Sequence, residues 1–191
     1  MEITGTEATS MLLSGRQLPR SETGSLKING SLDLHGADLK RIDLSRVTVT
    51  EGIDLTRVTV RGDVTFSDSV IRGDVMMNSI RIHGHLEFLN AILGNLKIPY
   101  AHIGEKLSLT NASINGLELC GVRIDGSLIL PGVKICGLLN MVNLRAESIV
   151  VDERVAQIFH MSVPHIPIIS AWSELAKTIW LKSNQSSKDE A

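Results

Sequence analysis

Hydrophobic residues recur along most of this chain as pairs two positions apart, each joined to the next pair by two or three residues. Twenty-four such pairs run without a break, with Ser69 as their one polar member, from Leu26/Ile28 to Ile149/Val151. Residues two apart in an extended chain point to the same side, so each pair predicts a very short strand with one buried face. A strand this short cannot bury its pair alone. The pattern therefore predicts an all-β solenoid of stacked strands.

The linkers between the pairs predict tight corners. After every second pair the linker has two residues, and elsewhere it has two or three. All eight three-residue linkers contain a glycine. Because glycine adopts positive φ at little steric cost, we expect that geometry, or another that only glycine tolerates, at these corners. The clearest cases are Gly62, Gly73, Gly84 and Gly126. These glycines are interpreted as corner residues, not as a phosphate-binding loop.

The register resembles that of the pentapeptide-repeat proteins over residues 26–151. The stretch ADLKRIDLSR at residues 37–46 is close to the A(D/N)LXX unit of that family, although the Asp or Asn before the central residue mostly disappears after Leu55. The resemblance implies a single-stranded parallel β-helix, four-sided and right-handed. Four pairs per coil then give about six coils, a rod of about 29 Å at about 4.8 Å per rung. A hexapeptide β-helix is excluded because no six-residue period is sustained.

The chain of 191 residues divides into one solenoid and its flanking segments. Residues 1–25 are rich in Ser, Thr and Gly and predict a flexible tail, and residues 183–191 predict a disordered one. Residues 152–182 form a segment with helices, in which apolar residues recur at helical spacing. These are Trp172, Leu175, Ala176, Ile179 and Trp180. We expect this stripe to cap the C-terminal end of the rod or to form a homodimer.

Composition narrows the function classes. Hydrophobic residues make up 43% and aromatic residues 3% of the chain, which suits a narrow aliphatic core. The net charge of −2 implies no general attraction to nucleic acid or to anionic membranes. Cys120 and Cys136 fall in linkers on different corners and predict free thiols in a reducing compartment. Neither end offers a signal sequence or a membrane span, so we expect a cytoplasmic location, or secretion without a cleavable signal peptide.

The register also assigns outward residues to faces, because each stacks on the residue four pairs away. One predicted face carries, in order, Asp38, Thr59, Arg81, His102, Arg123 and Arg145. Four bases on consecutive rungs would repel one another and would favour an acidic partner. The alternative is an ordinary solvated face whose charge is relieved by nearby acids such as Asp125 and Glu147.

A second candidate surface is apolar. Val70 and Ile92 stack on one predicted face and Met76 on the adjoining face, with Leu89 and Tyr100 in nearby linkers. Exposed apolar residues that gather in this way suggest a partner surface. Coverage by the N-terminal tail is the alternative.

No catalytic or metal-binding set is evident. His83 and His85 flank Gly84, but the corners above and below supply only Glu105 and Asp63, so a complete set of ligands does not converge. Ser/His/Asp and Cys/His sets cannot be assembled within the register. Linkers of two or three residues leave no groove in which the pKa values of two carboxyls could be driven apart. We therefore expect no enzyme activity, no cofactor and no metal.

The leading hypothesis is a non-catalytic protein-interaction or scaffold solenoid of bacterial origin. Members of the resembled family that mimic DNA need a strongly acidic rod, and this charge is balanced. Effector-type members delivered into host cells would suit the Ser/Thr-rich start. The alternative is a self-assembling structural protein like the bactofilins, which also repeat glycine between short aliphatic strands. Such a polymer needs both terminal coils bare.

Overall fold

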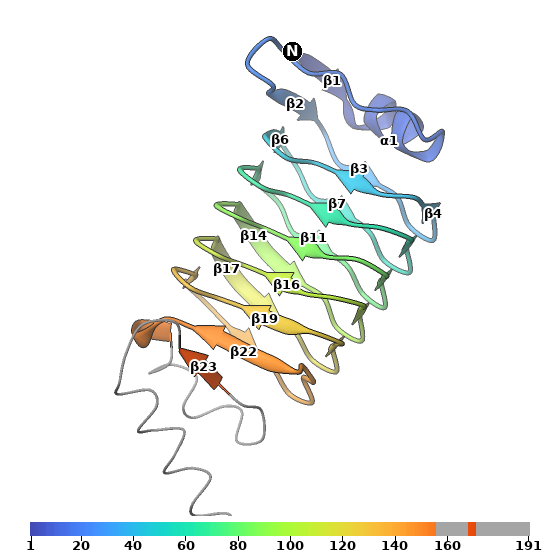
Figure 1. The fold of residues 1–191 in the computed structure, drawn as a ribbon. Helices are drawn as coiled ribbons and strands as arrows, with labels where there is room; N and C mark the ends of the chain where they lie inside the picture. Colours follow the sequence, from blue (N-terminus) through green and yellow to red (C-terminus); the bar gives the residue numbers. More distant parts are fainter. Residues whose placement is uncertain (156–167, 171–191) are drawn as a thin grey trace, which may run out of the picture.

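A computed structural model describes residues 1–155 and 168–170 of the chain. These residues form a parallel β-solenoid of about seven turns, which confirms the predicted all-β class (Figure 1). Every paired strand is parallel to its neighbour in the next coil, because the chain passes each face once per turn and always in the same direction.

The strands lie on four faces. Face one holds β1 (Glu2–Thr4), β2 (Leu26–Asn29), β6 (Val47–Val49), β10 (Val70–Ile71), β14 (Ile92–Lys97), β17 (Ser113–Glu118) and β20 (Lys134–Ile135). Face two holds β3 (Leu32–Asp33), β7 (Ile53–Asp54), β11 (Val75–Met76) and β21 (Leu139–Asn140), together with the second halves of β14 and β17. Because β14 and β17 continue through the corner, faces one and two belong to one sheet.

The other two faces are separate sheets. Face three holds β4 (Asp38–Leu39), β8 (Thr59–Val60), β12 (Arg81–Ile82), β15 (His102–Ile103) and β18 (Arg123–Ile124). Face four holds β5 (Ile42–Asp43), β9 (Val64–Thr65), β13 (Leu86–Glu87), β16 (Leu107–Ser108), β19 (Ser127–Ile129), β22 (Ser148–Val151) and β23 (Ile168–Ser170).

The predicted register is confirmed throughout the span 26–151. Arg81, for example, pairs with Thr59 in the coil before it and with His102 in the coil after it. All but four of the predicted inward residues are buried, and those four pack partly buried against the same core. They are Ala37, Ile135, Leu139 and Ala146. All four belong to the first or the last predicted coil, where stacking is one-sided.

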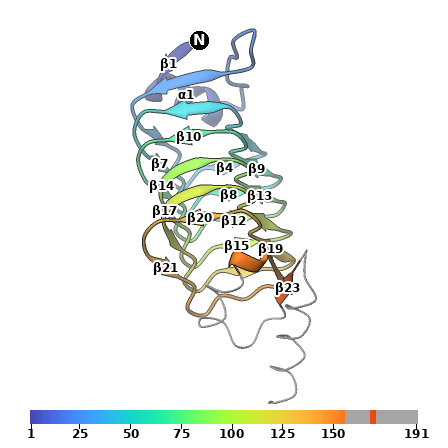
Figure 2. The same cartoon turned by 90° about the vertical axis from the view of Figure 1, so that its left-hand side faces the viewer.

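The solenoid has about seven turns where about six were predicted. Strand β1 pairs with β2 before the predicted span begins, and β23 pairs with β22 after it ends. Neither strand continues the alternating pairs, so the pair register did not place them in the stack. Strands added at the two ends satisfy hydrogen-bonding groups that an edge strand would otherwise leave unpaired. Figure 2 shows the stack from β1 and α1 at one end to β23 at the other.

The prediction of a flexible N-terminal tail is wrong for its first part. Residues Gly5–Leu13 form helix α1, which begins with a capping box between Thr4 and Glu7. The Glu7 carboxylate accepts from the Thr4 backbone N–H at 2.7 Å. This hydrogen bond, together with the one from the Thr4 side chain, lowers the pKa of Glu7. Ala8 and Leu12 are buried in the core cluster, so α1 covers the N-terminal end of the solenoid. The Thr4-x-x-Glu7 spacing before Met11 was the available sequence signal.

The rest of that segment is tied to the first coil. Leu18 is buried, and the Arg20 guanidinium donates to the backbone oxygens of Ser45 and Asp43. Arg20 also lies 3.6 Å from the Asp43 carboxylate. Composition alone does not reveal such anchors, because each depends on a residue of the folded first coil.

The core contains one aromatic layer among aliphatic side chains. Phe66 and Phe88 come from neighbouring coils of face four, and their rings stack with centroids 4.7 Å apart and planes 3° apart. Both side chains are fully buried. Ser69 and Ala91, which follow them three residues later, are small. The small side chains of Ser69 and Ala91 compensate for the volume of the two rings, so the core can keep a constant cross-section.

Replacing Ser69 with alanine is expected to raise the free energy of unfolding by about 1 kcal/mol. Ser69 is 1% exposed, and its Oγ finds no hydrogen-bond partner among the described residues. The stacked coils carry Ala91 and Ala112 at the same position, so alanine fits there. Urea denaturation of Ser69→Ala beside the outward-facing control Ser113→Ala measures the effect. Destabilisation by the first substitution would contradict the expectation.

The four glycines singled out from the sequence show the second of the two predicted geometries, a close approach of neighbouring coils, and not positive φ. Positive φ occurs instead at the second residue of the corners that join face two to face three and face four to face one, as at Tyr100 (φ 58°) and Asn90 (φ 54°). Among the three-residue corners Gly30 has positive φ (101°), whereas Gly62, Gly73, Gly84 and Gly126 do not. A Cβ on Gly73 would lie 2.7 Å from the Gly52 nitrogen in the coil below. Glycine is therefore required at these corners because successive coils approach closely, which is the other geometry that only glycine tolerates.

The predicted C-terminal stripe lies outside the described residues. It comprises Trp172, Leu175, Ala176, Ile179 and Trp180. The structure describes the C-terminal region up to Val155, which is buried. It then describes only strand β23. The expected cap or homodimer through this stripe thus stays a prediction.

Candidate functional site

Face three presents the predicted row of bases. We call Arg81, His102, Arg123 and Arg145 the basic column. Strands β12, β15 and β18 pair in register through the first three, and Arg145 continues the row through a parallel bridge to Arg123. All four side chains are exposed, because the alternating partners of each strand point into the core. Rungs about 4.8 Å apart set the spacing of the column.

Acids at the neighbouring corner neutralise part of this face. Asp125 accepts from Arg123 Nε and from His102 Nε2, each at 2.7 Å. These two hydrogen bonds hold the pKa of Asp125 below its usual range, and the bond from Arg123 has the larger effect. Lower on the same face, Asp38 accepts from Arg61 at 3.2 and 2.8 Å, and this pairing lowers the pKa of Asp38.

Two arginines of the basic column have no ion-pair partner in the described part of the chain. Within residues 1–155 neither Arg81 nor Arg145 lies within ion-pair distance of a carboxylate, and Glu147 does not reach Arg145. Nearby acids thus relieve the charge at Arg123 and His102, as the alternative interpretation of this face predicted. They do not do so at Arg81 and Arg145, the two ends of the column, within the described residues. The column can still attract an anionic group at both ends.

An apolar edge runs beside the basic column. We give this name to Tyr100, Cys120 and Val142, which lie on successive coils at the corner between faces two and three. The backbone N–H of Tyr100 donates to Cys120, and that of Gly121 donates to Val142. Tyr100 is 69% and Val142 is 61% exposed. Val142 was not predicted from the sequence as part of a surface, although the corner register places it next to Cys120.

The predicted mid-rod apolar residues are only partly brought together. Val70 and Ile92 pair on face one, and Leu89 occupies the corner just before Ile92. We call these three residues the apolar patch. Met76 lies on face two, across the corner where Lys97 donates to Asp74 at 2.8 Å. The N-terminal segment does not cover the patch, because its described contacts are to the first coil and the adjoining corner.

The histidine corner forms pairs rather than a ligand set. His85 Nε2 lies 2.8 Å from Glu105, and the His85 backbone N–H donates to Asp63 at 2.9 Å. His83 Nδ1 lies 3.2 Å from the Val60 carbonyl oxygen. Among the described residues, no three His, Cys, Asp or Glu side chains are placed to hold one metal ion. Cys120 and Cys136 are both free thiols.

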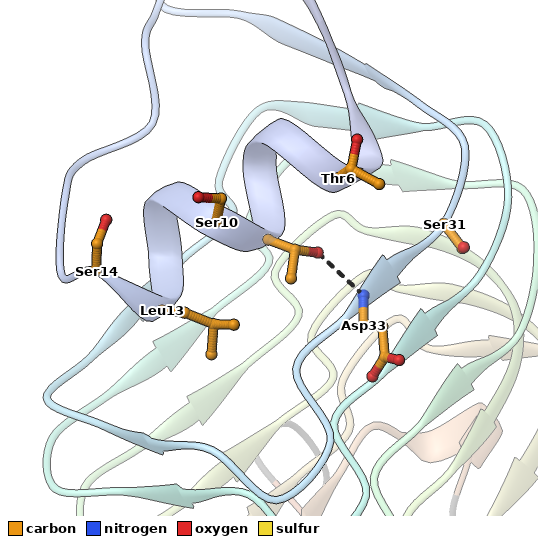
Figure 3. A pocket seen from close by; sticks show the side chains of 7 residues that line it. Thr6, Ser10, Leu13, Ser14, Ser31 and Asp33 are labelled. Atoms are coloured by element: carbon orange, nitrogen blue, oxygen red, sulfur yellow. Dashed lines mark hydrogen bonds between the residues drawn. The ribbon is translucent and has the colours of Figure 1, made fainter.

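One open hollow lies at the N-terminal end between α1 and β3 (Figure 3). Its polar lining consists of one carboxylate, Asp33, and the hydroxyls of Thr6, Thr9, Ser10, Ser14 and Ser31. Thr9 on α1 accepts from the Asp33 backbone N–H at 3.3 Å, which ties the helix to the first coil. A single carboxylate among hydroxyls lacks the second titrating group that acid–base chemistry requires.

These features define a β-helix repeat protein with flat, exposed faces. The chain matches no protein-family model, no curated protein and no solved structure. No helix in the described part of the chain is both long and apolar enough to cross a membrane.

Proposed function

We propose that this chain is a non-catalytic protein-binding solenoid, divergent from the pentapeptide-repeat proteins. The four faces and the short strands support that kinship. The observation that carries the binding function is the basic column, whose end members Arg81 and Arg145 have no acidic partner among the described residues. A stacked β-solenoid fixes the backbone from which the outward side chains project, so binding of a partner has to order side chains but no main chain.

The apolar patch supports the same function. Ile92 is 53% exposed and pairs with Val70 on the middle rungs of face one, and Leu89 is 41% exposed at the corner that precedes Ile92. Large apolar side chains on a rigid surface contribute to protein interfaces when a partner removes them from water. Flat faces without an enclosed recess suit a protein surface better than a small substrate.

Self-assembly into an end-to-end polymer is the weaker alternative. Such a polymer requires bare coils at both ends, but α1 covers the first coil and buries Ala8 and Leu12 there. At the other end, β23 pairs along β22 on face four. Both contacts would have to be displaced before one solenoid could stack on the next.

Affinity capture with two surface variants tests the proposal. The tagged chain is cross-linked in its source cells and compared with Arg81→Glu/Arg145→Glu and with Leu89→Asp/Ile92→Asp. We expect a stoichiometric protein partner whose recovery falls about tenfold with at least one variant. Arg72→Glu/Lys134→Glu is the matched control for the face-three reversal, because it reverses two exposed charges on or next to face one that make no ion pair in the described part of the chain. Unchanged recovery with both test variants would contradict the proposal.

A further inference from the structure

We infer that the basic column and the apolar edge together bind one α-helix of a partner protein, which lies along the solenoid axis. This helix carries carboxylates on one stripe and apolar side chains on the adjacent stripe. The inference rests on the proposed protein-binding function and adds the form and chemistry of the partner.

The spacing of the basic column favours a helix. Four bases on consecutive rungs span three intervals of about 4.8 Å, or about 14 Å in all. Three helical turns advance about 16 Å, so one carboxylate per turn stays close to each base, and long arginine side chains absorb the difference. Alternate residues of an extended strand lie about 6.7 Å apart, and the same three intervals would cover about 20 Å. A strand along the axis therefore loses register with the bases.

The apolar edge explains why the helix should be amphipathic. Tyr100 and Cys120 sit two residues before His102 and three before Arg123 in the chain, so the edge runs parallel to the basic column. No carboxylate stands at this corner in any of the six predicted coils, whereas Asp63, Glu105 and Asp125 stand at the corner on the opposite side of face three. A bound helix is therefore attracted to the bases and packs its apolar stripe towards Tyr100 and Val142. Arg and Tyr are residue types that dominate the energy of protein interfaces.

Nucleic acid fits the same surface less well. Tyr100 is the one exposed aromatic residue in the described part of the chain, so stacked bases would lack a platform. The overall charge of −2 gives no long-range attraction to a polyanion.

Fluorescence anisotropy with a synthetic helix tests the inference on the full chain. The probe is an alanine-rich peptide of about 18 residues, with one glutamate per turn and leucine on the neighbouring stripe. A scrambled peptide of the same composition is the second probe. The protein variants are Arg81→Glu/Arg145→Glu, Tyr100→Ser and the control Arg72→Glu/Lys134→Glu, each checked by thermal melting.

We expect the helical peptide to bind the parent chain and to lose about tenfold in affinity with the face-three charge reversal. Tyr100→Ser should weaken it about fivefold, and the control reversal should leave it unchanged. Equal binding of the scrambled peptide, equal damage by the control reversal, or stronger competition from a single-stranded oligonucleotide would overturn the inference. If the probe fails while cellular capture still depends on Leu89 and Ile92, the proposed function stands and this inference falls.

Discussion

Replacing Phe88 with alanine is expected to lower the free energy of unfolding by about 3–5 kcal/mol. The Phe88 side chain is fully buried, and its ring stacks on Phe66 from the coil below with a centroid distance of 4.7 Å. Removal leaves a cavity in a core whose walls are held by backbone hydrogen bonds between coils, such as Phe88 N–H to Ser108 O at 2.8 Å. The walls can therefore close only a little around it. Urea denaturation of Phe88→Ala measures the loss.

The neighbouring residue supplies the control for this prediction. Leu89 is 41% exposed at the following corner, so Leu89→Ala should lower the free energy of unfolding by less than about 1 kcal/mol.

A double-mutant cycle of Phe66→Ala and Phe88→Ala should show a favourable coupling of about 0.5–1.5 kcal/mol between the two rings. A loss for Phe88→Ala no larger than that for Leu89→Ala would show that the core collapses around the missing ring.

Replacing Gly73 with asparagine is expected to lower the free energy of unfolding by about 2–3 kcal/mol. The new Cβ would lie 2.7 Å from the Gly52 nitrogen and 2.8 Å from the Glu51 carbonyl carbon. Both are backbone atoms of the preceding coil, and they cannot move without loosening the Gly73 N–H to Glu51 O bond of 3.1 Å. The strain therefore falls on the stacking of two coils. Thermal and urea melts of Gly73→Asn measure it.

Gly36→Asn separates this cause from backbone conformation. Gly36 has φ of 69°, and a Cβ there meets nothing within 4 Å. Asn143 already adopts φ of 57° at the same corner of the last predicted coil, so asparagine should change stability by less than about 0.5 kcal/mol. If Gly36→Asn were the more damaging of the two substitutions, positive φ rather than coil contact would limit these corners.

The candidate site was predicted in part from the sequence. The register placed Arg81, His102, Arg123 and Arg145 in one row, because outward residues of a β-solenoid stack at a constant separation along the chain. It did not show which of them are neutralised. That depends on Asp125, whose side chain turns back from its corner to reach both Arg123 and His102. The exposure of Val142 likewise depends on what stacks beside its corner, which no periodicity records.

The sequence by itself determined the strand period, the four faces and the inward and outward sets. Burial of an apolar pair on each short strand leaves one register, since a shift of one residue would expose every pair. The tertiary structure alone decided the features that depend on contacts between residues remote in the chain. It made Gly73 a contact residue, placed α1 over the first coil and gave Arg81 and Arg145 no carboxylate partner among the residues that the structure describes. Each of these depends on distances between coils, and a linear pattern of hydrophobic residues contains no such distances.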